Sequence, residues 1–116
     1  MKDEKNRAYL YTRVNDGAEC GSFLDLQLRE LEQYCAEKGY EISGFTGFIG
    51  TAAQGKEEVD RLLERAREQH DFDVILTLKF SRLAIKYEDI VKYLNAFREL
   101  GITIECTRES LPSQNG

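Results

Sequence analysis

The sequence predicts a single α/β domain in which helices cover both faces of a four-stranded, mainly parallel sheet, giving three layers. Residues 74–78, Val-Ile-Leu-Thr-Leu, are almost continuously apolar, which is typical of a strand covered on both faces. Four strand-like segments also alternate with three segments of helical apolar period, and this alternation implies right-handed crossovers and a parallel sheet. The 116 residues suffice for one domain of this kind.

The first half of the domain begins with a strand expected at residues 8–14, where aromatic and β-branched side chains recur. Residues 16–23 contain two glycines among polar residues and predict a loop. A helix is expected at residues 24–38, because apolar side chains recur there every three or four positions. That apolar stripe consists of Leu24, Leu28, Leu31 and Cys35.

A second strand is expected at residues 40–45 and a second helix at residues 57–69. Between them, residues 46–56 contain three glycines and follow neither a helical nor a strand period. They predict a surface loop, which is either a tolerated connection or one of the loops that carry function.

The second half of the domain contains the strand at residues 74–78, a helix at residues 87–100 and a strand at residues 102–106. We expect the domain to occupy residues 8–111, with the strands at 8–14 and 74–78 adjacent inside the sheet. Disordered tails are expected at residues 1–7 and 112–116. Five apolar side chains are expected in the core, namely Leu31, Leu62, Ile75, Leu94 and Phe97.

A candidate site lies at the carboxyl end of the first strand. Open α/β sheets place their sites just beyond the carboxyl ends of strands. Because side chains alternate across a strand, Tyr11, Arg13 and Asn15 share one face, and Thr12 points to the other. Arg13 and Asn15 are therefore expected in any site that this domain has.

Composition limits the classes of function. The net charge of −5 argues against a protein that covers the DNA backbone over its whole surface, but it allows one local basic site. No apolar run reaches the roughly 18 residues of a membrane span, and the charged amino terminus is no secretory signal. The three cysteines form no C-x-x-C pair and the chain has a single histidine, so we expect reduced thiols, no metal site, no cofactor and a cytoplasmic protein.

Four motifs, in order along the chain, carry a resemblance. Residues 11–15 read Tyr-Thr-Arg-Val-Asn, and residues 24–29 read Leu-Asp-Leu-Gln-Leu-Arg. A glycine-bounded loop ends at Lys56, and residues 78–85 read Leu-Lys-Phe-Ser-Arg-Leu-Ala-Ile. These motifs resemble those of the N-terminal catalytic domain of the serine recombinases, the resolvase/invertase family, whose patterns are Tyr-x-Arg-Val-Ser, Leu-(Glu/Asp)-x-Gln, a Ser-Gly loop ending in arginine, and Lys-Leu-Asp-Arg-Leu-x-Arg. The resemblance covers residues 8–111 and implies a resolvase-like fold.

The resemblance also implies a chemistry and a set of site residues. In this family a serine hydroxyl attacks a DNA phosphodiester and forms a phosphoserine link, and arginines stabilise the charge on the phosphate oxygens. Carried over to this chain, the catalytic positions are Arg13, Asn15, Ser81 and Arg82. The phosphate-binding positions are Arg13, Gln27, Lys56, Lys79 and Arg82.

This sequence departs from the family pattern at its most important positions. Asn15 stands in the place of the nucleophilic serine, and Ser81 stands in the place of the aspartate. Ile85 replaces the last arginine, and Lys56 keeps the charge of the loop arginine without its bidentate geometry. Loss of a covalent nucleophile costs on the order of a millionfold in rate in an analogous enzyme. We therefore expect an inactive, degenerate recombinase domain.

Several alternatives remain open from the sequence. Ser81 could be a replacement nucleophile, although no histidine or carboxylate is near it in sequence, and Arg13 or Arg82 could simply form a salt bridge with Asp16 or Asp25. The domain could belong to a mobile element, could pair with itself or with an active recombinase through an apolar surface around the third helix, or could bind a small anion. Family members continue into a long DNA-crossing helix and a DNA-binding domain, and we expect neither in these 116 residues.

Overall fold

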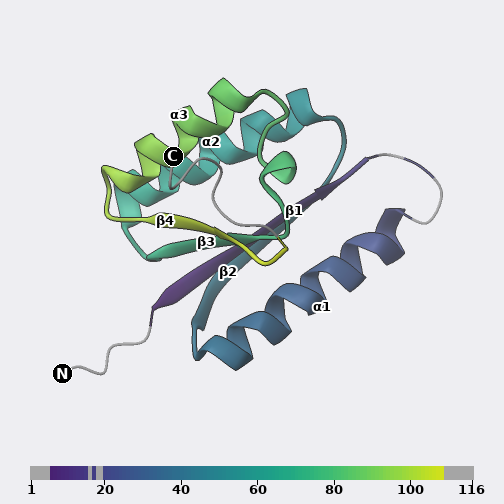
Figure 1. The fold of residues 1–116 in the computed structure, drawn as a ribbon, viewed down its shortest axis with the longest axis horizontal. Coiled ribbons are helices and arrows are strands. Elements are labelled where there is room, and N and C mark those ends of the chain that lie inside the picture. The colour runs from purple at the N-terminus through teal and green to yellow at the C-terminus, as the bar shows by residue number, and fades with distance from the viewer. Residues whose placement is uncertain (1–5, 16, 18–19, 109–116) are drawn as a thin grey trace.

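The four strands form one parallel sheet, as the sequence predicts (Figure 1). The computed structural model describes residues 6–15, 17 and 20–108. The strand order is β2-β1-β3-β4, so β1 and β3 are the adjacent inner strands, and that prediction is confirmed. The strands are β1 (Arg7–Val14), β2 (Glu41–Ile49), β3 (Val74–Thr77) and β4 (Thr103–Cys106).

The helices lie on both faces of the sheet, which confirms the three-layer α/β class (Figure 1). On one face, α1 (Cys20–Lys38) packs Leu31 and Cys35 against Ala8 and Leu10 of β1. On the other face, α2 (Ala52–Gln69) and α3 (Tyr87–Arg98) surround the larger core cluster. A short 3₁₀ turn, η1 (Phe80–Arg82), follows β3.

The predicted core is confirmed at four of its five positions. Leu31, Leu62, Ile75 and Phe97 are at most 4% exposed. Leu94 is only partly buried, because it packs at the margin of the α2–α3 cluster rather than inside it. Within the described residues, no helix is both long and apolar enough to cross a membrane.

The loop predicted at residues 46–56 is wrong. β2 continues through Ile49, and α2 begins at Ala52 after an N-cap at Thr51. Thr51 and Gln54 form a capping box, in which each side chain accepts a hydrogen bond from the backbone N–H of the other residue, at 3.1 and 2.9 Å. The spacing Thr-x-x-Gln was the available sequence signal for this helix start.

The glycines of β2 conceal the strand in the sequence. A Cβ at Gly44 would lie 2.9 Å from the Tyr9 ring, and one at Gly47 would lie 3.0 Å from the side chain of Leu24. Large neighbours therefore occupy the places where β2 lacks side chains, and the alternation that normally reveals a strand is lost.

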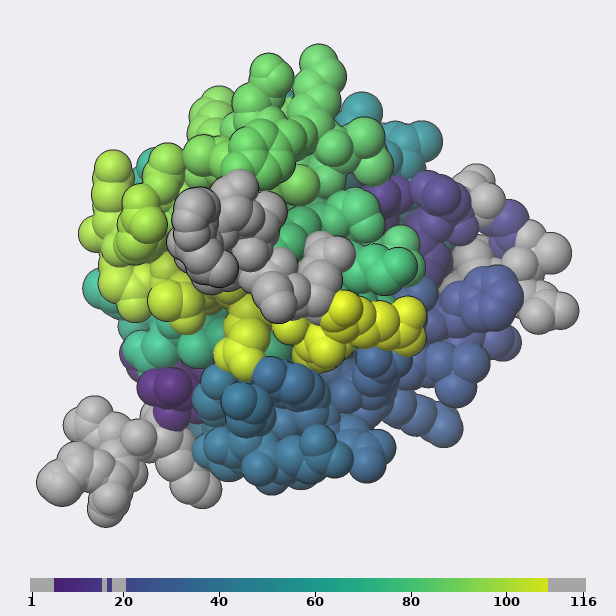
Figure 2. All heavy atoms as spheres, in the orientation of Figure 1, coloured from purple at the N-terminus to yellow at the C-terminus, as the bar shows by residue number. Residues whose placement is uncertain are grey.

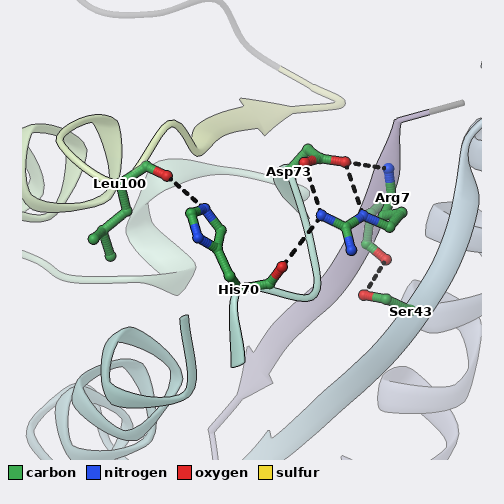
Figure 3. A network of polar contacts seen from close by, with 6 residues as sticks. Arg7, Ser43, His70, Asp73 and Leu100 are labelled. Atoms are coloured by element: carbon green, nitrogen blue, oxygen red, sulfur yellow. Dashed lines mark hydrogen bonds and ion pairs between the residues drawn. The ribbon is translucent and has the colours of Figure 1, made fainter. Parts of the chain in front are cut away.

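Other element ends differ by a few residues. α1 begins at Cys20 rather than residue 24, and α3 ends at Arg98 rather than residue 100. β1 begins at Arg7, whose guanidinium donates to both carboxylate oxygens of Asp73 at 3.1 Å (Figure 3). The rest of the expected amino-terminal tail, apart from Asn6, and the whole expected carboxyl-terminal tail lie outside the described residues.

Polar contacts join β4 to α1 on the face that α1 covers. Tyr34 and Tyr40 both donate hydrogen bonds to Glu105 of β4. Beyond β4, Arg108 forms an ion pair with Glu30 at 2.6 Å. In the space-filling view, the yellow atoms at the end of this strand border the blue atoms of α1 (Figure 2). α1 is thus held to both the inner and the outer part of the sheet.

Candidate functional site

The candidate site is built around Arg13, at the carboxyl end of β1. The side chain is only 5% exposed, and three segments supply its hydrogen-bond acceptors. Its Nη1 donates to Asn15 Oδ1 at 2.9 Å and to the Gly50 carbonyl at 3.0 Å, and its Nη2 donates to the Ser81 carbonyl at 3.3 Å. The guanidinium therefore links the segments that follow β1, β2 and β3, where the carboxyl ends of these strands meet.

All three of these acceptors are uncharged. Among the described residues, no carboxylate forms an ion pair with Arg13 or with Arg82. Asp16, one of the carboxylates that the sequence offered as a partner, lies outside the described residues. A buried charge satisfied only by neutral dipoles keeps a strong attraction for an anion.

Arg82 adds a second cation beside Arg13. Its Nε is buried, and no atom of the described structure accepts a hydrogen bond from it. The pKa of Arg82 is lowered first by burial and then by the charges of Arg13 and Arg108. The site thus brings together positive charges that disfavour one another, which is the arrangement that an anionic ligand would relieve.

The first turns of α2 lie directly against Arg13 because residue 55 is glycine. A Cβ at Gly55 would lie 2.7 Å from Arg13 Cδ and 3.2 Å from Tyr11 Oη. Tyr11 donates to the Gly55 carbonyl at 3.4 Å, and burial raises the pKa of Tyr11 to about 12. The phenol is therefore protonated at neutral pH and can donate this hydrogen bond.

Lys56 and Ile85, two positions that the resemblance associates with arginine, line a pocket of about 250 Å³. Lys56 Nζ lies 3.8 Å from a carboxylate oxygen of Asp89, so its charge is partly balanced. Ile85 is 64% exposed and has no polar group to offer. The complete lining consists of Ala52, Ala53, Lys56, Ala84, Ile85, Lys86 and Asp89.

The other predicted site residues, Gln27 and Lys79, lie elsewhere. Gln27 accepts a hydrogen bond from Thr12, on the face of the sheet that α1 covers, whereas Arg13 lies on the opposite face. Lys79 is exposed at the start of η1. The structure therefore groups Arg13, Asn15, Ser81 and Arg82 and separates Gln27 from them.

The site can hold an anion, but it lacks an activated nucleophile at residue 15. The amide oxygen of Asn15 is engaged by Arg13, and amide nitrogen is a poor nucleophile. The Ser81 residue contacts Arg13 through its carbonyl, and within the described residues no base is hydrogen-bonded to its hydroxyl. The geometry is that of an α/β domain with a cationic site at the carboxyl ends of its strands.

Comparison with known proteins identifies the class of this domain. The family model described as the N-terminal domain of resolvase matches residues 8–116. The chain therefore belongs to the resolvase family of serine recombinases, and it corresponds to their N-terminal domain. A search of curated protein sequences found no match.

Solved structures of serine recombinases share the fold. A resolvase family site-specific recombinase from Streptococcus pneumoniae is 24% identical with a TM-score of 0.80, covering 97% of this chain and 78% of that one. The N-terminal catalytic domain of TP901-1 integrase is 23% identical with a TM-score of 0.72, covering 86% and 75%. The C-terminal catalytic domain of ISC1926 TnpA, an IS607-like serine recombinase, is 22% identical with a TM-score of 0.74, covering 90% and 71%.

Sequence reasoning missed the two backbone elements that complete the site. The Gly50 carbonyl accepts from Arg13, and Gly55 allows α2 to approach it. Both glycines lie in the segment predicted as a loop. Thr51 and Gln54 between them carried the capping-box signal that would have located the helix start, although not its contacts with Arg13.

Proposed function

We propose that this domain is a catalytically inactive member of the serine recombinases that binds a phosphate of DNA at Arg13 and Arg82 without cleaving it. The observation that carries the proposal is the 2.9 Å hydrogen bond from Arg13 Nη1 to Asn15 Oδ1. A carboxamide stands beside the arginine, at the position where the resemblance requires a hydroxyl nucleophile. The cation is retained and the attacking group is not.

Two further positions support inactivity. Ser81 replaces a carboxylate that would help to organise the site, and Ile85 replaces a cation that would hold a phosphate oxygen. Loss of one arginine that stabilises the transition state of phosphoryl transfer costs roughly a thousandfold in rate. Restoring the serine alone therefore leaves the site incomplete.

In this proposal the partner is the DNA backbone, which the domain binds in the cytoplasm through one local site. The whole chain has a net charge of −5, so non-specific binding along its surface is unfavourable. Arg13, Arg82 and the exposed Lys79 supply positive charge at the carboxyl ends of β1 and β3. We expect DNA binding to depend on these three cations and to weaken steeply as salt concentration rises.

The experiment is a cleavage assay with supercoiled plasmid, followed by protease treatment and a search for nicked DNA or a covalent protein–DNA band. We expect neither product from the natural chain or from Asn15→Ser. The triple variant Asn15→Ser, Ser81→Asp, Ile85→Arg is the matched gain-of-function arm, because it restores three of the four substituted positions and the fourth, Lys56, has kept its charge. A covalent band from the natural chain that disappears in Ser81→Ala would overturn the proposal and make Ser81 the nucleophile.

A further inference from the structure

β2 is the edge of the sheet that lies beside α1 (Figure 1). Its neighbour on the inner side is β1, and no described strand pairs with its outer side. Natural edge strands are usually protected by charged side chains, proline or marked shortness. β2 is nine residues long, and residues 42–50 contain neither a charged side chain nor a proline.

The register of β2 against β1 shifts between Ile42 and Gly44, and beyond this irregularity the outer edge presents backbone hydrogen-bonding groups in a regular pattern. The Gly50 N–H donates to the Val14 carbonyl of β1 at 2.9 Å. Because backbone groups alternate in direction along a strand, those of residues 46 and 48 also point toward β1, and those of residues 45, 47 and 49 point outward. Another strand can therefore pair with this edge.

Apolar side chains accompany this edge on the α1 face of the sheet. Phe45 and Ile49 pair in register with Leu10 and Val14 of β1. Leu10 belongs to the core cluster under α1, so Phe45 and Ile49 share that face. Phe45 is 61% exposed and Ile49 is 40% exposed, although Leu24 of α1 lies over Gly47 between them. Such exposed apolar groups along an unpaired edge indicate an interaction surface.

We propose that β2 pairs in antiparallel fashion with β2 of a second copy of this chain, with Gly47 opposite Gly47. This register places Phe45 of each copy opposite Ile49 of the other. Cross-strand pairs of aromatic and β-branched residues are favourable, and a two-fold axis makes both pairs equivalent. The result is one continuous eight-stranded sheet.

The two-fold register favours a second copy as the occupant, and charge does not oppose it at this edge. Each chain has a net charge of −5, so most approaches of two copies meet like charge. The segment at residues 42–50 is neutral, and the charged Glu41 and Lys56 lie beyond the paired residues in this register. The edge therefore matches its own copy without placing like charges opposite each other. This inference is independent of the proposed phosphate site at the carboxyl ends of the strands.

The first test is sedimentation and light scattering of the natural chain at concentrations up to about 1 mM. At that concentration a dimer with a dissociation constant of about 1 mM is half formed. We expect a dimer that Phe45→Glu dissociates by at least about tenfold, because the variant places a carboxylate against an apolar pair. Leu26→Glu is the matched control, since Leu26 is 60% exposed but lies on α1 and not on the edge. A natural chain that stays monomeric, a dimer that survives Phe45→Glu, or equal loss in Leu26→Glu would each overturn the proposal.

The second test fixes the register and guards against variants that fail to fold. Phe45→Lys and Ile49→Glu are prepared separately, and each is checked by circular dichroism. When they are mixed, Lys at residue 45 faces Glu at residue 49 of the other chain, while the second pair remains apolar. We expect the mixture to form a heterodimer at least about tenfold tighter than either homodimer. Two folded variants that do not associate on mixing would exclude this pairing.

Discussion

The two ends of β1 hold their arginines in opposite ways. At the amino end, Arg7 forms a bidentate ion pair with Asp73 and also donates to the His70 carbonyl (Figure 3). At the carboxyl end, Arg13 is bonded only to uncharged oxygens among the described residues. The same strand thus carries one cation whose charge a carboxylate balances and one whose charge no carboxylate of the described residues balances.

The difference separates a structural cation from a candidate ligand-binding one. A paired arginine such as Arg7 gains little from an added anion, because a carboxylate already occupies its donors. Arg13 and Arg82 are close enough for Arg13 to lower the pKa of Arg82, and an anion between them would reduce this repulsion. What identifies the candidate site is therefore an arginine that is not paired with a described carboxylate, rather than the presence of an arginine.

The largest expected effect is on anion affinity. Arg13→Met should weaken the binding of inorganic phosphate at least about tenfold, because charge-assisted hydrogen bonds contribute about 1.5–3 kcal/mol. Arg7→Met should leave that affinity unchanged. Isothermal titration of the natural chain and both variants measures the difference. Equal weakening by the two substitutions would remove the distinction between the two ends of β1.

The next effect is on stability, with opposite signs for two arginines. Arg82→Met should raise the free energy of unfolding by about 1 kcal/mol, because it removes a buried donor that has no partner in the part of the chain that the structure describes. Arg65→Met should lower it, because Arg65 pairs with Asp71 at 2.7 Å and stacks over the Tyr9 ring. Urea denaturation at neutral pH measures both. A marked loss of stability in Arg82→Met would show that its charge is satisfied in the folded protein.

The smallest effect is a pH dependence confined to the amino end. The hydrogen bond from Arg7 holds the pKa of Asp73 below its usual value. The pair therefore stabilises the fold above the unfolded pKa of about 3.9, and this contribution is lost as pH falls through the lower folded pKa. Arg7→Met should cost about 0.5 kcal/mol at pH 7 and less near pH 2, because the carboxyl group becomes protonated as pH falls.

The matched variant for this measurement is Arg13→Met. The acceptors of Arg13 are an amide and two carbonyls, none of which titrates in that range. Its effect on the free energy of unfolding should therefore be the same at both pH values. A pH-dependent difference in Arg13→Met would point to a carboxylate near the guanidinium.

Sequence patterns located most elements because each carried its own signal. The apolar run at residues 74–78 predicted the buried inner strand, and the stripe through Leu31 predicted α1. The prediction of a loop at residues 46–56 was wrong, because the side chains that pack against this part of β2 come from another part of the chain. Gly47 is covered by Leu24 of α1, which no local period can reveal.

Sequence alone determined the alternation of strands and helices and the parallel sheet. It also determined that Arg13 lies at the carboxyl end of one strand and Arg82 after the adjacent one. Tertiary structure decided which charges are balanced. Arg7 meets a carboxylate 66 residues away, whereas Arg13 meets the carbonyls of residues 37 and 68 positions away. It also placed Gln27 on the opposite face from Arg13 and left β2 at the edge. Periodicity records which face of its own element a residue occupies, but the partner of a charge depends on distances across the folded chain.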